Sequence, residues 1–277
     1  MLAPLMAIPV RAQERTVQRH RAADPEGRLI AFYSSAMLFS PVGAAPGAGG
    51  LSLGMDATWL PRLSEAQRRP GIDKPETTNL APVVPRPRLA WRAPGGIVVE
   101  GSWIPPLQVG EAKANVVAGA ISRTLGVWRG VSFTPRLSAV AGRVSGAITC
   151  NARTARGGGP SLAIYYLNVC HDRDSDDYFE PRLLAGELVA SRRLPRIGAE
   201  AYAALGARAD RTRFDIGVIR SDGSRDPDHP VLRLHDTRAH LSVGGRWDVA
   251  RHFGAAAEWF YAPGSISSVR LYAGWRR

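Results

Sequence analysis

The sequence has no segment able to cross a membrane as a helix, and it is nearly devoid of lysine. No uninterrupted apolar run in the 277 residues reaches about 18, the length that a spanning helix requires. Of the 36 basic residues, only Lys74 and Lys113 are lysine, and the rest are arginine. Despite the net charge of +12, no compact basic cluster with stacking aromatic residues occurs. A helical membrane protein is therefore excluded, and nucleic acid is not an expected partner.

The excess of arginine has two interpretations. Codon bias in a GC-rich genome is the simpler one. The functional one is an electropositive lumen or rim that attracts anionic solutes or lipid phosphates. The sequence alone leaves both open.

Cysteine is also scarce. The chain has two, Cys150 and Cys170, on either side of a glycine-rich polar stretch. In an exported protein an even number of cysteines argues for a disulfide, and closing a loop of about 20 residues contributes roughly 3 kcal/mol. Two unpaired cysteines are the alternative. A zinc site is not expected, because only His171 lies near the pair.

Two segments near the C-terminus alternate apolar and polar residues one for one. The first, residues 253–261, places Trp259 and Tyr261 on its apolar face, and the second, residues 268–275, places Leu271 and Trp275 there. Successive side chains of a strand point to opposite faces, so this period of two means one apolar and one polar surface. The apolar faces are rich in alanine and carry tryptophan near the segment ends. That pattern is typical of a lipid-facing barrel wall with an aromatic girdle.

Similar segments recur from Leu51 onward. The predicted strands are residues 51–59, 88–91, 97–103, 113–123, 131–149, 183–191, 197–208, 213–219, 235–247, 253–261 and 268–275. Residues 61–85, with many prolines and charges, are predicted to be a long loop. Because single-chain bacterial barrels have even strand numbers, we expect about 12 strands, within a range of about 10 to 14. The sequence thus predicts an all-β protein, a transmembrane antiparallel β-barrel over residues 49–277.

The N-terminal part is predicted to differ from the barrel. Residues 1–12 resemble a signal peptide, with an apolar stretch and small residues around Val10-Arg11-Ala12. A basic n-region is missing, so the peptide is truncated or the true start lies upstream, and an ordinary apolar strand is the alternative. Within residues 13–48, Leu29 and Phe32 begin a helical spacing. We expect this short helical and extended segment to enter the barrel as a plug or to rest on its periplasmic mouth.

Taken together, the chain resembles bacterial outer-membrane β-barrel proteins. The resemblance covers residues 49–277 and rests on the export signal, the short turns on one rim, the long polar loops on the other and the amphipathic final strand. Residues 268–275 are similar to the C-terminal assembly signal of the class, although Arg276 and Arg277 follow it. The helical segment before the barrel is faintly similar to the long-chain fatty acid transporter family, without any residue motif of that family. The resemblance implies the outer membrane of a Gram-negative cell.

Charged and polar residues on the inward faces are the candidate lumen lining. They are Glu100, Arg143, Glu200, Arg208, Arg238, His240, Ser242, Arg246, Glu258 and Arg270. Small barrels fill their interiors with paired charges, and a charged constriction in a pore is the alternative. The pair His240 and Ser242 also has the minimum for acyl hydrolysis, a histidine beside a serine. Its spacing is similar to the His-x-Ser of outer-membrane lipid A deacylases, which act on the lipid-facing surface, whereas this register points the pair inward.

The sequence therefore favours a non-enzymatic barrel, a porin-like channel or transporter for small hydrophobic or anionic molecules. A plugged structural or surface-interaction barrel is the second hypothesis, and a membrane acyl hydrolase is the third. We expect no cofactor, no metal site and no catalytic residue. The expected partners are outer-membrane lipids, the barrel-assembly machinery and a small-molecule cargo.

Overall fold

The computed structural model describes residues 16–43, 50–68, 82–106, 108–109, 112–157 and 160–277. The predicted signal peptide, residues 1–12, lies outside these ranges. Among the described residues, no helix is long and apolar enough to span a membrane.

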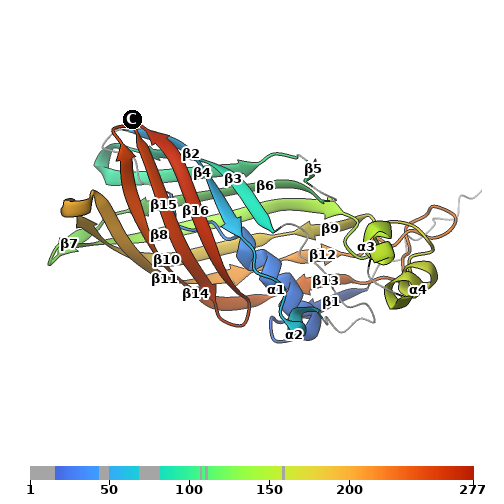
Figure 1. Cartoon of the computed structure of the whole chain (residues 1–277). Coiled ribbons are helices and arrows are strands. Elements are labelled where there is room, and N and C mark those ends of the chain that lie inside the picture. Colours follow the sequence, from blue (N-terminus) through green and yellow to red (C-terminus); the bar gives the residue numbers. More distant parts are fainter. Residues whose placement is uncertain (1–15, 44–49, 69–81, 107, 110–111, 158–159) are drawn as a thin grey trace, which may run out of the picture.

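Ten strands close into an antiparallel barrel (Figure 1). They are β2 (Leu51–Trp59), β3 (Val83–Arg92), β4 (Ile97–Ile104), β6 (Ala112–Arg123), β8 (Val131–Gly146), β10 (Arg182–Leu194), β11 (Ala199–Asp210), β14 (Asp236–Ala250), β15 (Phe253–Ala262) and β16 (Ile266–Arg276). Pairing of β16 with β2 and of β6 with β8 completes the ring. The all-β barrel is confirmed, while the expected count of twelve strands is not.

Of the eleven segments predicted as strands, ten correspond to wall strands, and residues 213–219 do not. Only β12 (Arg213–Asp215) forms there, and it continues β11 beyond the barrel instead of adding a wall strand. It pairs with β9 (Asp177–Glu180) and with β13 (Val231–Leu234), and β13 in turn carries β1 (Val17–His20) in parallel. Alternation of apolar and polar residues indicates that a segment is a strand, but it does not indicate whether that strand belongs to the barrel ring. Beyond the end of β11, the wall thus extends into a small mixed sheet of β9, β12, β13 and β1.

The two ends of the barrel differ in the length of their connections. One end, the short-turn rim, holds the 3-10 turns Pro94–Gly96 and Pro195–Ile197, the small strand β7 (Gly126–Trp128) and the C-terminus. The other end, the long-loop rim, holds α2 (Glu65–Arg68), β5 (Gln108–Val109), α3 (Ala152–Gly157), α4 (Pro160–Asn168) and the mixed sheet. Figure 1 shows the C-terminus and the helices α3 and α4 at opposite ends.

The outward face of the wall is an apolar band between basic residues. On β10, Arg182 and Arg192 are exposed on the outward face and are ten residues apart, and on β6 Lys113 and Arg123 have the same spacing. The outward positions between the two arginines are all apolar or glycine: Leu184, Gly186, Leu188 and Ala190. Ten residues span roughly 33 Å along a strand, or about 25 Å of height at the usual tilt. That height matches the apolar layer of a transmembrane barrel.

Helix α1 (Pro25–Met37) precedes the barrel strands in sequence and packs inside the ring. Proline at its first position has the backbone angle that a helix start needs and lacks an N–H that would go unpaired there. Ala31, Phe32 and Ala36 are almost fully buried and belong to the same core as wall residues such as Val116 and Val140. The helix ends at Met37, and the chain continues through the lumen without regular structure to residue 43.

A substitution in the middle of the apolar band tests the register. We expect Leu188→Arg to lower the yield of folded protein in the membrane, because a lipid-facing arginine near the midplane costs about 2–4 kcal/mol. Leu188 is 49% exposed on the outward face of β10. The matched control is Leu125→Arg, since Leu125 is 74% exposed and lies beyond Arg123 on the short-turn rim. Heat-modifiable gel mobility measures folding, and equal loss in both variants would contradict the assigned band.

Candidate functional site

Five arginines from four wall strands, β3, β8, β14 and β16, hold the N-terminal segment in the lumen. Each donates a hydrogen bond to a main-chain carbonyl of residues 35–41: Arg270 to Ser35 (3.3 Å), Arg86 to Met37 (2.9 Å), Arg136 to Phe39 (2.7 Å), Arg88 to Ser40 (2.6 Å) and Arg246 to Pro41 (2.6 Å). Residues 38–41 lie in no helix or strand, so their buried carbonyls need donors from elsewhere. Guanidinium groups, with five N–H donors each, supply them.

The ring of Phe39 lies at the centre of this arrangement. The guanidinium carbons of Arg88, Arg136 and Arg86 are 4.0, 5.1 and 5.7 Å from the ring centroid. The side chain of Phe39 is fully buried. Cation–π contacts of this kind contribute about 2 kcal/mol where they are desolvated. Three arginines therefore hold the lumen segment through the ring of Phe39.

Carboxylates on the inner wall balance the arginines. Arg136 binds Glu100 at 2.8 Å and also binds Glu187, and Arg88 lies 3.4 Å from Glu100. Farther along the lumen, two further pairs join Arg246 to Glu200 (2.8 Å) and Arg270 to Glu258 (3.4 Å). Buried charges are tolerated when paired and hydrogen-bonded in this way. We call these side chains, with residues 34–41, the lumen network.

Most of the predicted lumen residues belong to this network or face it. Glu100, Glu200, Arg246, Glu258 and Arg270 form its ion pairs, and Arg208 donates to the hydroxyl of Ser35 at 2.5 Å. Arg238 lies at the long-loop rim, where it donates to the carbonyl of Pro263.

Arg143 does not line the lumen. The outward positions of β8 are odd-numbered, as the exposure of Leu137 (51%) shows, and Arg143 shares their parity. Its side chain is 56% exposed, binds Glu180 at 2.6 Å and lies over the ring of Tyr178. Arg143 is paired with Asn115 of β6, two residues from Lys113, so this charge lies at the long-loop edge of the apolar band. The prediction for Arg143 is wrong because it assigned an odd-numbered position of β8 to the inner face.

The arginines around Phe39 were not among the predicted lumen residues. Arg88 begins the predicted strand 88–91 but was not assigned to the lumen, and Arg86 precedes that strand because β3 begins at Val83, within the segment predicted to be a loop. The alternation was present in Pro85-Arg86-Pro87-Arg88, but the prolines concealed the strand. Arg136 alternates with apolar residues on β8 in the same way.

His240 and Ser242 are both buried on the inward face of β14. Nε2 of His240 is 3.5 Å from a carboxylate oxygen of Glu187, and its ring lies 5.9 Å from that of Phe260. Within the described residues, the Ser242 hydroxyl and both ring nitrogens of His240 make no hydrogen bond. The geometry therefore gives the histidine a carboxylate neighbour but does not give it the serine contact that activates a nucleophile.

An apolar cavity of about 250 Å³ lies near the long-loop rim. Its inner side is formed by Leu29, Tyr33 and Met37 of α1, and its outer side includes Met55, Pro85 and Pro87. Met55 is on the lipid-facing side of β2, where it is 53% exposed. A cavity lined from both sides of the wall must pass through the wall.

The strand pairing explains the opening. β3 and β4 are paired only where Arg88–Arg92 meet Val98–Ser102. Toward the long-loop rim, residues 83–87 pair only with β2, and Trp103 and Ile104 pair only with β6. Pro85 and Pro87 have no N–H and cannot complete a ladder on that side. The cavity opens sideways through this gap between β3 and β4.

A second cavity of about 270 Å³ opens at the short-turn rim and is mainly polar. It is lined by Arg92, Glu100 and Arg136, among others, and by Pro41 of the lumen segment. Met37 lines the apolar cavity and Pro41 the polar one. Residues 37–41 therefore separate the two cavities.

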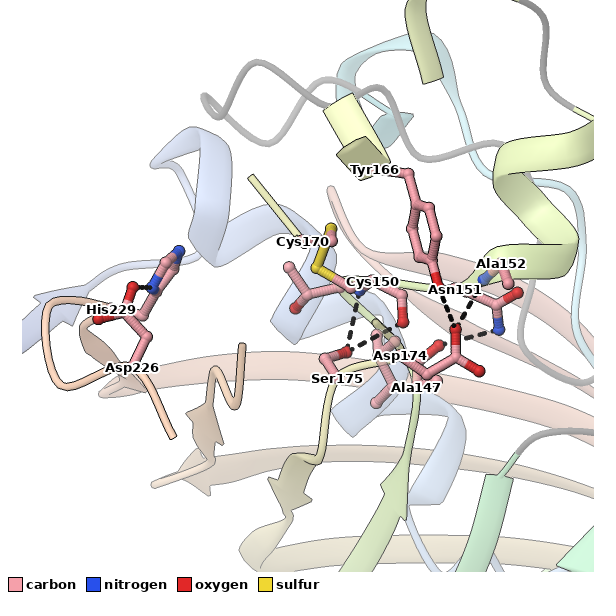
Figure 2. The surroundings of a disulfide bond; sticks show 12 residues. Ala147, Cys150, Asn151, Ala152, Tyr166, Cys170, Asp174, Ser175, Asp226 and His229 are labelled. Atoms are coloured by element: carbon pink, nitrogen blue, oxygen red, sulfur yellow. Dashed lines mark hydrogen bonds and ion pairs between the residues drawn. A yellow bond between two sulfur atoms is a disulfide. The ribbon is translucent and has the colours of Figure 1, made fainter. Parts of the chain in front are cut away.

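The long-loop rim is fastened by a disulfide between Cys150 and Cys170, as the sequence predicts (Figure 2). The amide of Cys150 donates to the hydroxyl of Ser175 at 2.9 Å. On the other side, the hydroxyl of Tyr166 donates to Asp174 at 3.1 Å. Burial, and then the Asp174 carboxylate, raise the pKa of Tyr166 to about 12, so this donor stays protonated at neutral pH.

The closed ring, its apolar outer band and the exposed tryptophans at the strand ends together decide the class. Trp59, Trp91 and Trp247 are 62%, 46% and 42% exposed, at the ends of their strands where an aromatic girdle lies. The chain is an outer-membrane β-barrel protein. No protein-family model matches it, and no curated protein does.

Solved structures similar to this chain include several outer-membrane barrels. The translocator domain of the autotransporter NalP from Neisseria meningitidis is 9% identical over 90% of this chain and 94% of its own, with a TM-score of 0.37. The Ralstonia pickettii toluene transporter TbuX is 12% identical over 87% and 98%, with a TM-score of 0.33. Ail of Yersinia pestis, solved with the heparin analogue sucrose octasulfate, is 11% identical over 83% and 100%, with a TM-score of 0.31. Similarities this low do not identify a ligand.

Removing the central arginine tests the lumen network. We expect Arg136→Leu to lower the free energy of unfolding by about 3–5 kcal/mol, because Glu100 and Glu187 would stay buried without the cation that makes their shortest ion pairs. The control is Arg143→Leu on the same strand, whose exposed ion pair contributes about 0–1 kcal/mol. Urea unfolding of each variant, refolded into lipid vesicles, measures the difference. A loss for Arg136→Leu no larger than that for Arg143→Leu would mean that the network does not stabilise the barrel.

Proposed function

We propose that this barrel is a transporter for a small hydrophobic molecule, which it takes from the membrane through the gap between β3 and β4. The observation that carries the proposal is the apolar cavity lined from both sides of the wall by residues such as Tyr33 and Pro87. Binding sites for small molecules are typically concave and mostly apolar. The gap gives a hydrophobic molecule a route from lipid to cavity that avoids water.

An anionic cargo has less support. Arg246 is bound to Glu200 and to the carbonyl of Pro41, and Arg270 to Glu258 and to the carbonyl of Ser35. Guanidinium groups occupied in this way present little net field to a passing anion. The arginines therefore support a packed lumen more than an anion-selective constriction.

Passage from the apolar cavity to the polar one requires residues 37–41 to move. In the arrangement described, these residues fill the lumen between the two cavities. Transport would then consist of loading through the wall, displacement of the Phe39 segment and release at the short-turn rim. The filled lumen is also the observation that favours the second hypothesis, a plugged structural or surface-interaction barrel.

Filling the cavity tests the binding site. We expect Ala114→Trp, at a lining position, to reduce cross-linking of an alkyl diazirine probe about tenfold or more, since the indole would occupy the space that the probe needs. Ala203→Trp is the matched control, because Ala203 is exposed on the lipid-facing side of β11. The measurement is the yield of cross-linked peptides in protein embedded in lipid nanodiscs. Equal labelling of both variants would remove the cavity from the proposal.

Conductance separates the transporter from an open pore. We expect the wild-type protein to carry no steady current in planar bilayers, and Phe39→Ala to give intermittent openings, because the arginines lose the ring that they surround. Phe253→Ala is the control, since Phe253 is 55% exposed on the outside of β15. A steady current from the wild type would favour a channel, and silence of Phe39→Ala would favour the plugged scaffold.

A further inference from the structure

The N-terminal segment crosses the whole barrel, and it enters from the long-loop rim. Strand β1 runs parallel to β13 in the mixed sheet beyond the barrel, with the carbonyl of Thr16 accepting from Val231 at 2.9 Å and that of His20 from His235 at 3.1 Å. The amide of Ala22 then donates to Asp236 at 3.1 Å, where β14 begins. Helix α1 follows and leads into the lumen.

Contacts with β11 give the direction and the depth of this passage. The hydroxyl of Ser34 donates to Asp210 at the end of β11. The hydroxyl of Ser35 accepts from Arg208, two residues earlier on the same face of that strand. The carbonyl of Pro41 accepts from Arg246 of β14, and Arg246 is paired with Glu200 at the start of β11. From Ser34 to Pro41, the wall partners of the segment thus shift from the end of β11 to the level of its start, where Glu200 is paired with Arg246 of β14.

Strand β2 then starts at the short-turn rim, the end that also holds the C-terminus (Figure 1). In outer-membrane barrels the short turns face the periplasm and the long loops face outward. The first strand of the ring therefore starts on the periplasmic side, while β1 lies on the opposite side of the membrane.

We propose that Thr16 and strand β1 lie on the cell surface, so that the barrel displays its own N-terminal side. This inference does not depend on the hydrophobic cargo. The lumen network and the pairing of β1 with β13 act as the anchor of the displayed part. Five arginines from four strands, β3, β8, β14 and β16, hold the lumen segment inside the ring.

Thiol labelling of intact cells tests the orientation. Gln18→Cys, exposed on β1, is compared with Ser221→Cys in a loop of the long-loop rim and with Arg196→Cys in the short turn between β10 and β11. The native cysteines are bonded to each other and do not react. We expect a membrane-impermeant maleimide to label Gln18→Cys and Ser221→Cys in intact cells, and to label Arg196→Cys only after the outer membrane is permeabilised.

A second measurement covers the case in which the new cysteine disturbs folding. An epitope tag inserted between residues 15 and 16 interrupts none of the described elements. We expect antibody to bind it on intact cells whose barrel shows heat-modifiable mobility. Detection of the tag or of Gln18→Cys only after permeabilisation would overturn the proposal, as would labelling of Arg196→Cys in intact cells.

Discussion

A strand of the barrel wall satisfies its backbone through its neighbours, but a chain that runs through the lumen has no such neighbours. Each buried carbonyl of residues 35–41 must find a donor on the wall, and arginine reaches it from any side. Those arginines bring positive charge into a confined space, which in turn requires Glu100, Glu187, Glu200 and Glu258. The filled lumen, the inner ion pairs and part of the excess of arginine follow from this single requirement.

The sequence predicted the faces of the wall well, because face depends only on the parity of a position. The alternation on β14 placed His240 and Ser242 inward and Val243 outward, and the structure agrees. The disulfide was also predictable, since an exported chain with two cysteines has one pairing available. Strand number was less certain, because β12 alternates like a wall strand although it lies beyond the ring.

The lumen network was only half predictable. Parity places Glu100 and Arg246 inside, but it does not fix depth, and depth decides which charges meet. The register between neighbouring strands sets that depth, and no local pattern in one strand encodes it. Two errors were of another kind: Arg143 was assigned to the wrong face of β8, and the start of β3 at Val83 was hidden among prolines.

The gap between β3 and β4 also has a mechanical consequence. Five residues of each strand, Arg88–Arg92 and Val98–Ser102, carry the whole pairing at this point of the ring, whereas β6 and β8 share eleven pairs. Unpaired N–H groups facing lipid are costly, and Pro85 and Pro87 have none to leave unpaired. Separating β3 from β4 therefore costs less free energy than separating β6 from β8. Amide exchange in the native protein should be fastest along β3 and β4.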